Sequence, residues 1–195
     1  MPGLDKGWNK GRGAVAAAAV AGSLYLVERV SLIPAYRAIT GFAPSDLQTP
    51  LSQVMIGIEL GAFEERAALG AYAAYAAVDF VLGVALAAML TFLWMWLFEK
   101  APTKAFAFLK RGGILMLPSY VVILDMAAKV GFYRLLHGLS GEALSETIAF
   151  CATVHRLHLA VADIRDLLAA VFLGVAAAVA AKRLRKSGAA GSLRP

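Results

Sequence analysis

Four long apolar stretches limit what this chain can fold into. They cover residues 13–34, 67–98, 114–136 and 164–181, and a helix needs about 20 mostly apolar residues to cross a lipid bilayer. Only 16% of the residues are charged and 60% are hydrophobic, whereas soluble domains contain about 25% charged residues. Runs of Ala, Leu and Val without a period of two favour helices over barrel strands. The sequence therefore predicts an all-α polytopic integral membrane protein, a single membrane domain built as a four-transmembrane-helix bundle.

Basic residues predict the orientation of the bundle. Twelve Lys and Arg residues lie in segments 1–12, 99–113 and 182–195, and four spans place these three segments on one side of the membrane. The positive-inside rule then puts both termini in the cytoplasm, or its organellar equivalent, and the spans in a bacterial inner membrane or an organellar inner membrane. Residues 1–21 also have the outline of a signal peptide. We favour a retained first span because apolar residues continue from Leu24 to Val27.

The segments that connect the spans on the opposite side are long enough to form structure of their own. After Pro44, Ser45 or Asp46 can cap a helix over about residues 45–60, with apolar residues at helical spacing. We expect an amphipathic helix there, either a lid or partner-docking element, or a connector that buries its apolar side. The second segment, 137–163, is compatible with another helix.

Aromatic residues follow each other closely near the end of the second stretch. Trp94, Trp96 and Phe98 lie beside the basic loop. Because Trp is enriched where a membrane meets water, we expect these side chains to form an aromatic belt.

Ionisable residues within the apolar stretches are the strongest indication of a site. An ionised side chain at membrane depth is costly unless it is paired, hydrated or neutralised. Rough span midpoints place Glu28, Asp79 and Lys129 at one level, about 6 Å from the midplane on the outer side. Asp125 and Lys129 are four residues apart on one helix, so they share a face. Arg165 and Asp166 are expected closer to the outer interface.

We therefore predict a polar pocket in the outer half of the bundle. Its candidate residues are Glu28, Asp79, Asp125, Lys129, Tyr25, Tyr75 and Tyr120. One interpretation is a buried ion network that fixes how the helices align. The other is a functional pocket for a lipid-like ligand, an ion or a proton.

Metal and cofactor chemistry has little support in the sequence. His155 and His158 are three residues apart, so both imidazoles face one side of a helix, but the sequence fixes no third ligand and they are only weak metal candidates. The single cysteine, Cys151, fits a small buried apolar side chain. No nucleophile elbow, phosphate-binding glycine loop or CxxC pair occurs. We expect no cofactor and no nucleic-acid partner, because anionic lipids explain the basic tails.

A few positions resemble a widespread group of small uncharacterised four-span membrane proteins. The shared pattern is Tyr75, Asp79, Phe80 and Leu86 in the second stretch and Pro118 and Asp125 in the third. This chain differs in having Gly83 near a Pro of the group's pattern and Ala128-Lys129 in place of Glu-Asn. The resemblance implies the four-span layout over about residues 14–182 and the importance of the two aspartates. It implies no reaction.

Three functions fit these observations. The first is a non-catalytic accessory or scaffold subunit of a larger membrane complex, with membrane lipids and other integral membrane subunits, or a second copy, as partners. The second is a small membrane enzyme or binder for an isoprenoid, sterol-like or other lipid ligand that uses the intramembrane carboxylates. The third is a proton- or ion-coupled transporter. Whether the protein is an enzyme stays open at this point.

Overall fold

The structure is a computed structural model that describes residues 6–44, 47, 53–54, 56, 66–100, 104–137 and 140–191 of the 195-residue chain. Every regular element in this described part is a helix. Three segments within it are long and apolar enough to cross a membrane, namely Asn9–Thr40, Ala68–Lys100 and Ile114–Leu135. The all-helical fold is thus confirmed, and three of the predicted spans are helices of suitable length and composition.

The first predicted span is a continuous helix whose hydrogen bonding changes near its middle. α1 (Lys6–Val27) continues into η1, a five-residue π-helical turn (Glu28–Leu32), and then into α2 (Ile33–Thr40). Pro34 lies in the first turn of α2. A proline lacks an N–H and its ring clashes with the carbonyl group four residues earlier, so the wider π-turn accommodates it. Pro34 therefore does not end the helix; Gly41 does, with a left-handed φ of 77°.

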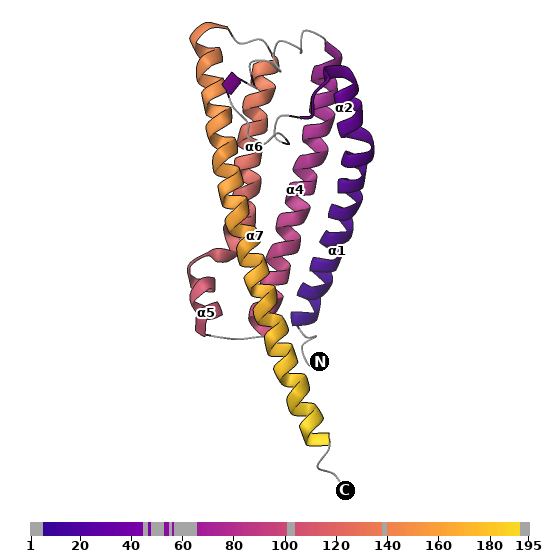
Figure 1. The fold of residues 1–195 in the computed structure, drawn as a ribbon, viewed down its shortest axis with the longest axis vertical. Helices are drawn as coiled ribbons and strands as arrows, with labels where there is room; N and C mark the ends of the chain where they lie inside the picture. The colour runs from indigo at the N-terminus through magenta and orange to yellow at the C-terminus, as the bar shows by residue number, and fades with distance from the viewer. Residues whose placement is uncertain are drawn as a thin grey trace.

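The second predicted span, α4 (Arg66–Lys100), is 35 residues long and packs along α1 (Figure 1). Small side chains form the contact: Ala14 and Ala21 of α1 are buried, and Ala21 packs with Leu82 and Ala85 of α4. Alanines let two helix backbones approach closely, which is the usual way that helices pack within lipid.

After α4 the chain forms a short helix, a single turn and the third predicted span. These are α5 (Lys104–Arg111), η3 (Ile114–Met116) and α6 (Leu117–Leu136). Pro118 lies in the first turn of α6, where its missing N–H would be unpaired in any case. It therefore starts this helix and leaves the rest of α6 uninterrupted.

The last element, α7 (Gly141–Gly191), is one helix of 51 residues and is therefore about 76 Å long. It packs antiparallel to α6, and a Cβ atom at Gly131 would lie only 2.5 Å from the Cys151 Sγ atom. Leu117, at the start of α6, and Leu168 pack against the same cluster of aromatic side chains. Residues 164–181 thus extend from the level where α6 starts, and the end of α7 projects beyond the bundle (Figure 1).

The predicted outer helix over residues 45–60 lies mostly outside the described residues. Gln53, Val54 and Ile56 are helical. The Ile56 side chain is buried in the core at the end of the bundle where α2 lies. The amphipathic character of the segment stays a prediction.

Aromatic side chains form the core at both ends of the bundle. At the end where α2 lies, Tyr36, Tyr72, Tyr75 and Phe132 are buried together. At the opposite end lies the aromatic cluster, which we define as Trp94, Leu97, Phe98, Phe106 and Phe172. Trp94 is fully buried and Phe98 is 8% exposed, so these two side chains belong to the interior and not to the belt that the sequence suggested.

Candidate functional site

The site is organised around Lys129, a buried ammonium group on α6. Its side chain is 3% exposed. The Nζ atom donates a hydrogen bond to Oδ2 of Asp125 at 2.5 Å and forms an ion pair with Asp79 of α4. One lysine thus joins two helices through two carboxylates, as expected for charges that need partners at membrane depth.

Local helix geometry explains this arrangement. Asp125 and Lys129 are four residues apart, so one turn of α6 places both side chains on the same face. Gly83 lies one turn beyond Asp79 on α4, and a Cβ there would be 3.6 Å from a methyl group of Val122. This is an ordinary van der Waals distance, so α4 and α6 lie close together here, which lets Asp79 reach across to Lys129.

A cavity of about 220 Å³ lies beside these charges, between α4, α6 and α7. Its polar lining comes from all three helices and its remaining wall is aliphatic. The polar side chains in the lining are Tyr75, Asp79, Asp125, His158 and Arg165. The volume is below the range of about 300–1,000 Å³ that is typical of sites for drug-sized ligands.

His158 brings α7 into the same network. Its Nδ1 atom lies 3.9 Å from Oδ1 of Asp125. His155 is buried one turn away, and the two imidazole rings are parallel with centroids 6.3 Å apart. We call Asp79, Asp125, Lys129 and His158 the charge cluster. No group of three or more His, Cys, Asp or Glu side chains in the described part of the chain is arranged to hold a metal ion.

The sum of the formal charges in the cluster indicates which neighbouring groups can balance it. Two ionised aspartates and one lysine leave one negative charge, which Arg165 at the cavity wall or a protonated His158 can balance. Arg165 is 20% exposed and its Nε atom also donates to Oδ1 of Asp166 at 2.7 Å. The cavity is therefore lined by both signs of charge.

The structure separates the remaining predicted residues from this cavity. Tyr25 is 49% exposed, with the guanidinium of Arg29 5.2 Å from its ring centroid. Tyr120 is 56% exposed on α6. Glu28 is 3% exposed and lies in η1, which packs against α4. Among the described residues, these three are absent from the cavity lining, whereas Tyr75 belongs to it.

Two lining residues were not assigned to the pocket by sequence reasoning. His158 was considered only as a metal ligand, and Arg165 was placed nearer the outer interface. The positions of both side chains at the cavity result from the continuity of α7, which runs along α6 from Cys151 past Arg165. The spacing of seven residues between them, two helical turns, is the signal that could have placed them on one face.

No protein-family model, curated protein or solved structure matches this chain.

Proposed function

We propose that this protein crosses the membrane four times and acts as a non-catalytic accessory or scaffold subunit of a larger membrane complex. The start of α1 and the end of α7 lie at the same end of the bundle (Figure 1), which supports an even number of crossings. This end includes Lys10 and the basic helix α5, so the positive-inside rule places it in the cytoplasm.

The amphipathic surface of α7 supports the fourth crossing. His158 and Arg165 line the cavity between α4, α6 and α7, whereas Leu157, Ile164 and Leu167 are 51%, 52% and 66% exposed. The same stretch also exposes Arg156, Asp163 and Asp166, so its outward surface is mixed, and the fourth crossing is supported by the aliphatic side chains alone. Because Cys151 and His158 lie beside Gly131 and Asp125 of α6, and residues 164–181 start where α6 begins, the proposed crossing uses a part of α7 that begins before the predicted residue 164.

The pairing of the carboxylates supports a structural role for the charge cluster. A general acid or base must exchange a proton with a substrate. Asp79 and Asp125 share the ammonium of Lys129, and an adjacent cation stabilises the charged form of a carboxyl group. The observation that carries the proposal is this bridge, because it uses the carboxylates of Asp79 and Asp125 to hold α4 against α6.

A face of small, exposed residues on α1 supports the presence of a partner helix. Ala18 and Gly22 of α1 are exposed, and nothing lies within 4 Å of a Cβ built at Gly22. The two residues are four apart, the small-xxx-small spacing at which transmembrane helices associate. Ala14 and Ala21, in contrast, are already buried against α4.

Native mass spectrometry of the protein, purified gently from its own membrane, tests the proposal. A stoichiometric complex with a different, larger membrane protein is expected. The double variant Ala18→Leu/Gly22→Leu should reduce the amount of complex at least about tenfold, because two added side chains block close helix approach. Gly174→Leu is the matched control, since Gly174 is exposed on α7 with nothing within 4 Å of its Cβ position. A protein recovered alone or only as a dimer would contradict the accessory role.

The cavity between α4, α6 and α7 favours a second candidate, a small membrane enzyme or a binder for the polar end of a lipid-like molecule. Its wall combines Asp79, Asp125, His158 and Arg165 at the intramembrane interface of three helices. In that case the purified protein retains one defined small mass, and Asp79→Asn or Asp125→Asn removes this mass while the fold persists. Loss of the folded protein in both variants would instead indicate a structural network.

A further inference from the structure

An open groove runs along the contact between α6 and α7, separate from the cavity at the charge cluster. Its volume is about 560 Å³, within the range of small-molecule sites. Two small residues of α6 that are four apart, Ala127 and Gly131, line its hollow. Larger apolar side chains flank them, and Ile123, Val130 and Phe150 are exposed. The groove is therefore apolar along most of its length and open to the surroundings of the bundle.

One end of the groove has both signs of charge. Arg134 of α6 and Glu146 of α7 belong to the groove lining, and both are exposed. Because the helices are antiparallel and Gly131 lies beside Cys151, both charged residues lie on the same side of this contact, about 4.5 and 7.5 Å from it along the helix axes. Ile123 lies about 12 Å from the contact in the other direction. The charges are therefore at one end, and the aliphatic side chains extend away from them.

The two charged side chains are available to a ligand. Within the part of the chain that the structure describes, no ion pair joins Arg134 to Glu146, and neither side chain has an ion pair or hydrogen bond to another residue. Arg134 precedes the last residue of the candidate membrane span Ile114–Leu135, so it lies at the level expected for lipid headgroups. A cation and an anion at this level, next to an apolar groove, match the charge pattern of a zwitterionic headgroup.

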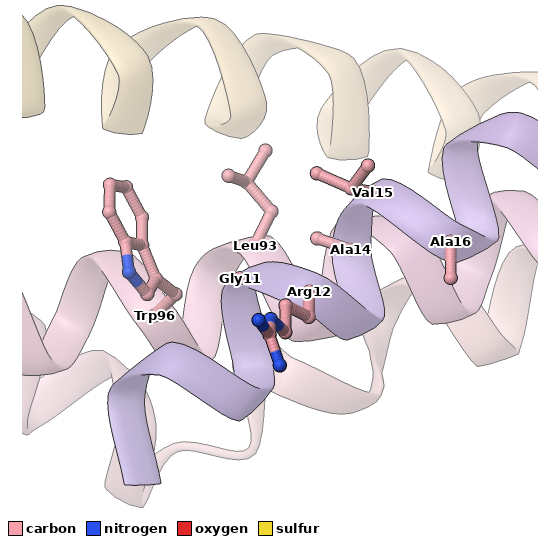
Figure 2. Close-up of a pocket in the computed structure, with 7 residues that line it drawn as sticks. All are labelled: Gly11, Arg12, Ala14, Val15, Ala16, Leu93 and Trp96. Carbon is pink, nitrogen blue, oxygen red and sulfur yellow. The ribbon is translucent and has the colours of Figure 1, made fainter. Parts of the chain in front are cut away.

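A larger groove between α1 and α4 lacks this charge pattern. Its volume is about 700 Å³, and Val15, Leu93 and Trp96 point to the same side of α1 and α4, toward the ribbon of α7 (Figure 2). The guanidinium of Arg12 lies on the opposite side of α1 (Figure 2). Apolar contact alone does not select a headgroup, so this groove provides a control site.

We propose that the groove between α6 and α7 binds one zwitterionic phospholipid with a primary amine, such as phosphatidylethanolamine. Arg134 binds the phosphate, Glu146 accepts hydrogen bonds from the ammonium group, and an acyl chain lies over Ala127 and Ile123. Charge complementarity selects this occupant, because a choline headgroup has no N–H to donate and a glycerol headgroup has no cation for Glu146. The site rests on the proposed membrane crossing by α6 and α7, and it does not depend on the accessory role.

Lipid retention by the purified full-length chain tests this proposal. The protein in a neutral detergent is incubated with phosphatidylethanolamine, phosphatidylcholine or phosphatidylglycerol of the same acyl chains, and bound lipid is counted by native mass spectrometry. We expect one phosphatidylethanolamine to be retained in preference to the other two lipids. Glu146→Gln should reduce the preference over phosphatidylcholine about fivefold, which corresponds to about 1 kcal/mol, the upper end for an exposed ion pair. Glu142→Gln, at an exposed position one turn earlier on α7 and outside the groove lining, should change it less than twofold.

Three further substitutions locate the site. Arg134→Gln should reduce retention of phosphatidylethanolamine and phosphatidylcholine by the same factor, because both lipids contain the phosphate. Ala127→Leu fills the hollow and should abolish retention of both lipids. Ala16→Leu adds the same side chain in the groove of Figure 2 and should leave retention unchanged. Both leucine variants are expected to fold, because Leu favours a helix nearly as much as Ala does.

Several results would overturn the proposal. Equal retention of phosphatidylethanolamine and phosphatidylcholine, or a preference for phosphatidylglycerol, would overturn the choice of lipid. Unchanged retention in Ala127→Leu, or an unchanged preference in the exposed variant Glu146→Gln, would overturn the location. Retention lost in Asp79→Asn and kept in Glu146→Gln would place the lipid in the cavity at the charge cluster instead. Because the accessory role is tested by a co-purifying protein and this site by the isolated chain, either can fail without the other.

Discussion

The charge cluster joins α4, α6 and α7, and the aromatic cluster joins α4, α5 and α7, but the two do so by different physical interactions. In the charge cluster, the Lys129 ammonium donates to the Asp125 carboxylate and forms an ion pair with Asp79. In the aromatic cluster, Phe172 meets Trp94, Phe98 and Phe106 edge to face, at centroid distances of 5.3, 5.3 and 5.5 Å. Ion pairs specify which residues meet, whereas apolar packing depends on shape and tolerates similar side chains. We therefore expect the register of these helices to depend more on the ion pairs than on the aromatic packing.

The largest expected effect comes from removing the central cation. Lys129→Met leaves the partly buried carboxylates of Asp79 and Asp125 without their shared partner, which should lower the free energy of unfolding by about 3 kcal/mol. Unfolding in mixed micelles, followed by circular dichroism, measures this change.

A neutral triple variant separates charge from packing. Asp79→Asn/Asp125→Asn/Lys129→Met removes all three formal charges, so most of the lost stability should return. If the triple variant is as unstable as Lys129→Met alone, the comparison fails, because the defect would then come from the shape of Lys129.

Substitutions in the aromatic cluster should change stability according to the volume they remove, and less according to the identity of the side chain. Phe172→Ala opens a cavity among three rings and should cost about 3 kcal/mol in the same unfolding experiment. Phe172→Leu keeps most of the volume and should cost about 1 kcal/mol. Equal losses in the two variants would mean that the edge-to-face geometry, and not the filling of space, stabilises this end.

The contact between α6 and α7 gives a smaller, steric effect. In Gly131→Ala the new methyl group would meet the Cys151 Sγ atom at 2.5 Å, so the helices must shift at a cost of about 2 kcal/mol. Cys151→Ala in the same chain removes the sulfur atom and should restore most of the stability. Additive losses in the double variant would show that the two residues do not meet.

The smallest effect is expected at Gly83, beside the charge cluster. A Cβ there would lie 3.6 Å from Val122, which is ordinary contact. Gly83→Ala should therefore stabilise the protein by less than about 1 kcal/mol, because Ala favours a helix. A clear destabilisation measured by thermal unfolding would mean that α4 and α6 pack more tightly here than around the ions.

The sequence predicts that Asp79, Asp125 and Lys129 lie near one another, and the structure shows them paired, but the sequence does not place α7 beside them. Asp125 and Lys129 were paired from their spacing, and Asp79 was placed at the same level, because helix periodicity and the energetic penalty for unpaired charge are local rules. His158 and Arg165 were not assigned to the pocket, because their position depends on where α7 aligns with α6. Tyr25 and Tyr120 share the apolar stretches, yet the rotation of their helices turns both outward.

The amino-acid sequence by itself determined that the described chain is helical and that three of its segments are suited to lipid, because hydrophobicity and the need to satisfy backbone hydrogen bonds act within one segment. It also determined that Lys129 needs carboxylate partners. Only the tertiary structure decided that Trp94 and Phe98 are interior residues, that Pro34 is absorbed by a π-turn, and that α7 continues unbroken along α6. These features depend on how helices distant in sequence rotate and slide against each other, and that depends on side-chain contacts that no single segment contains.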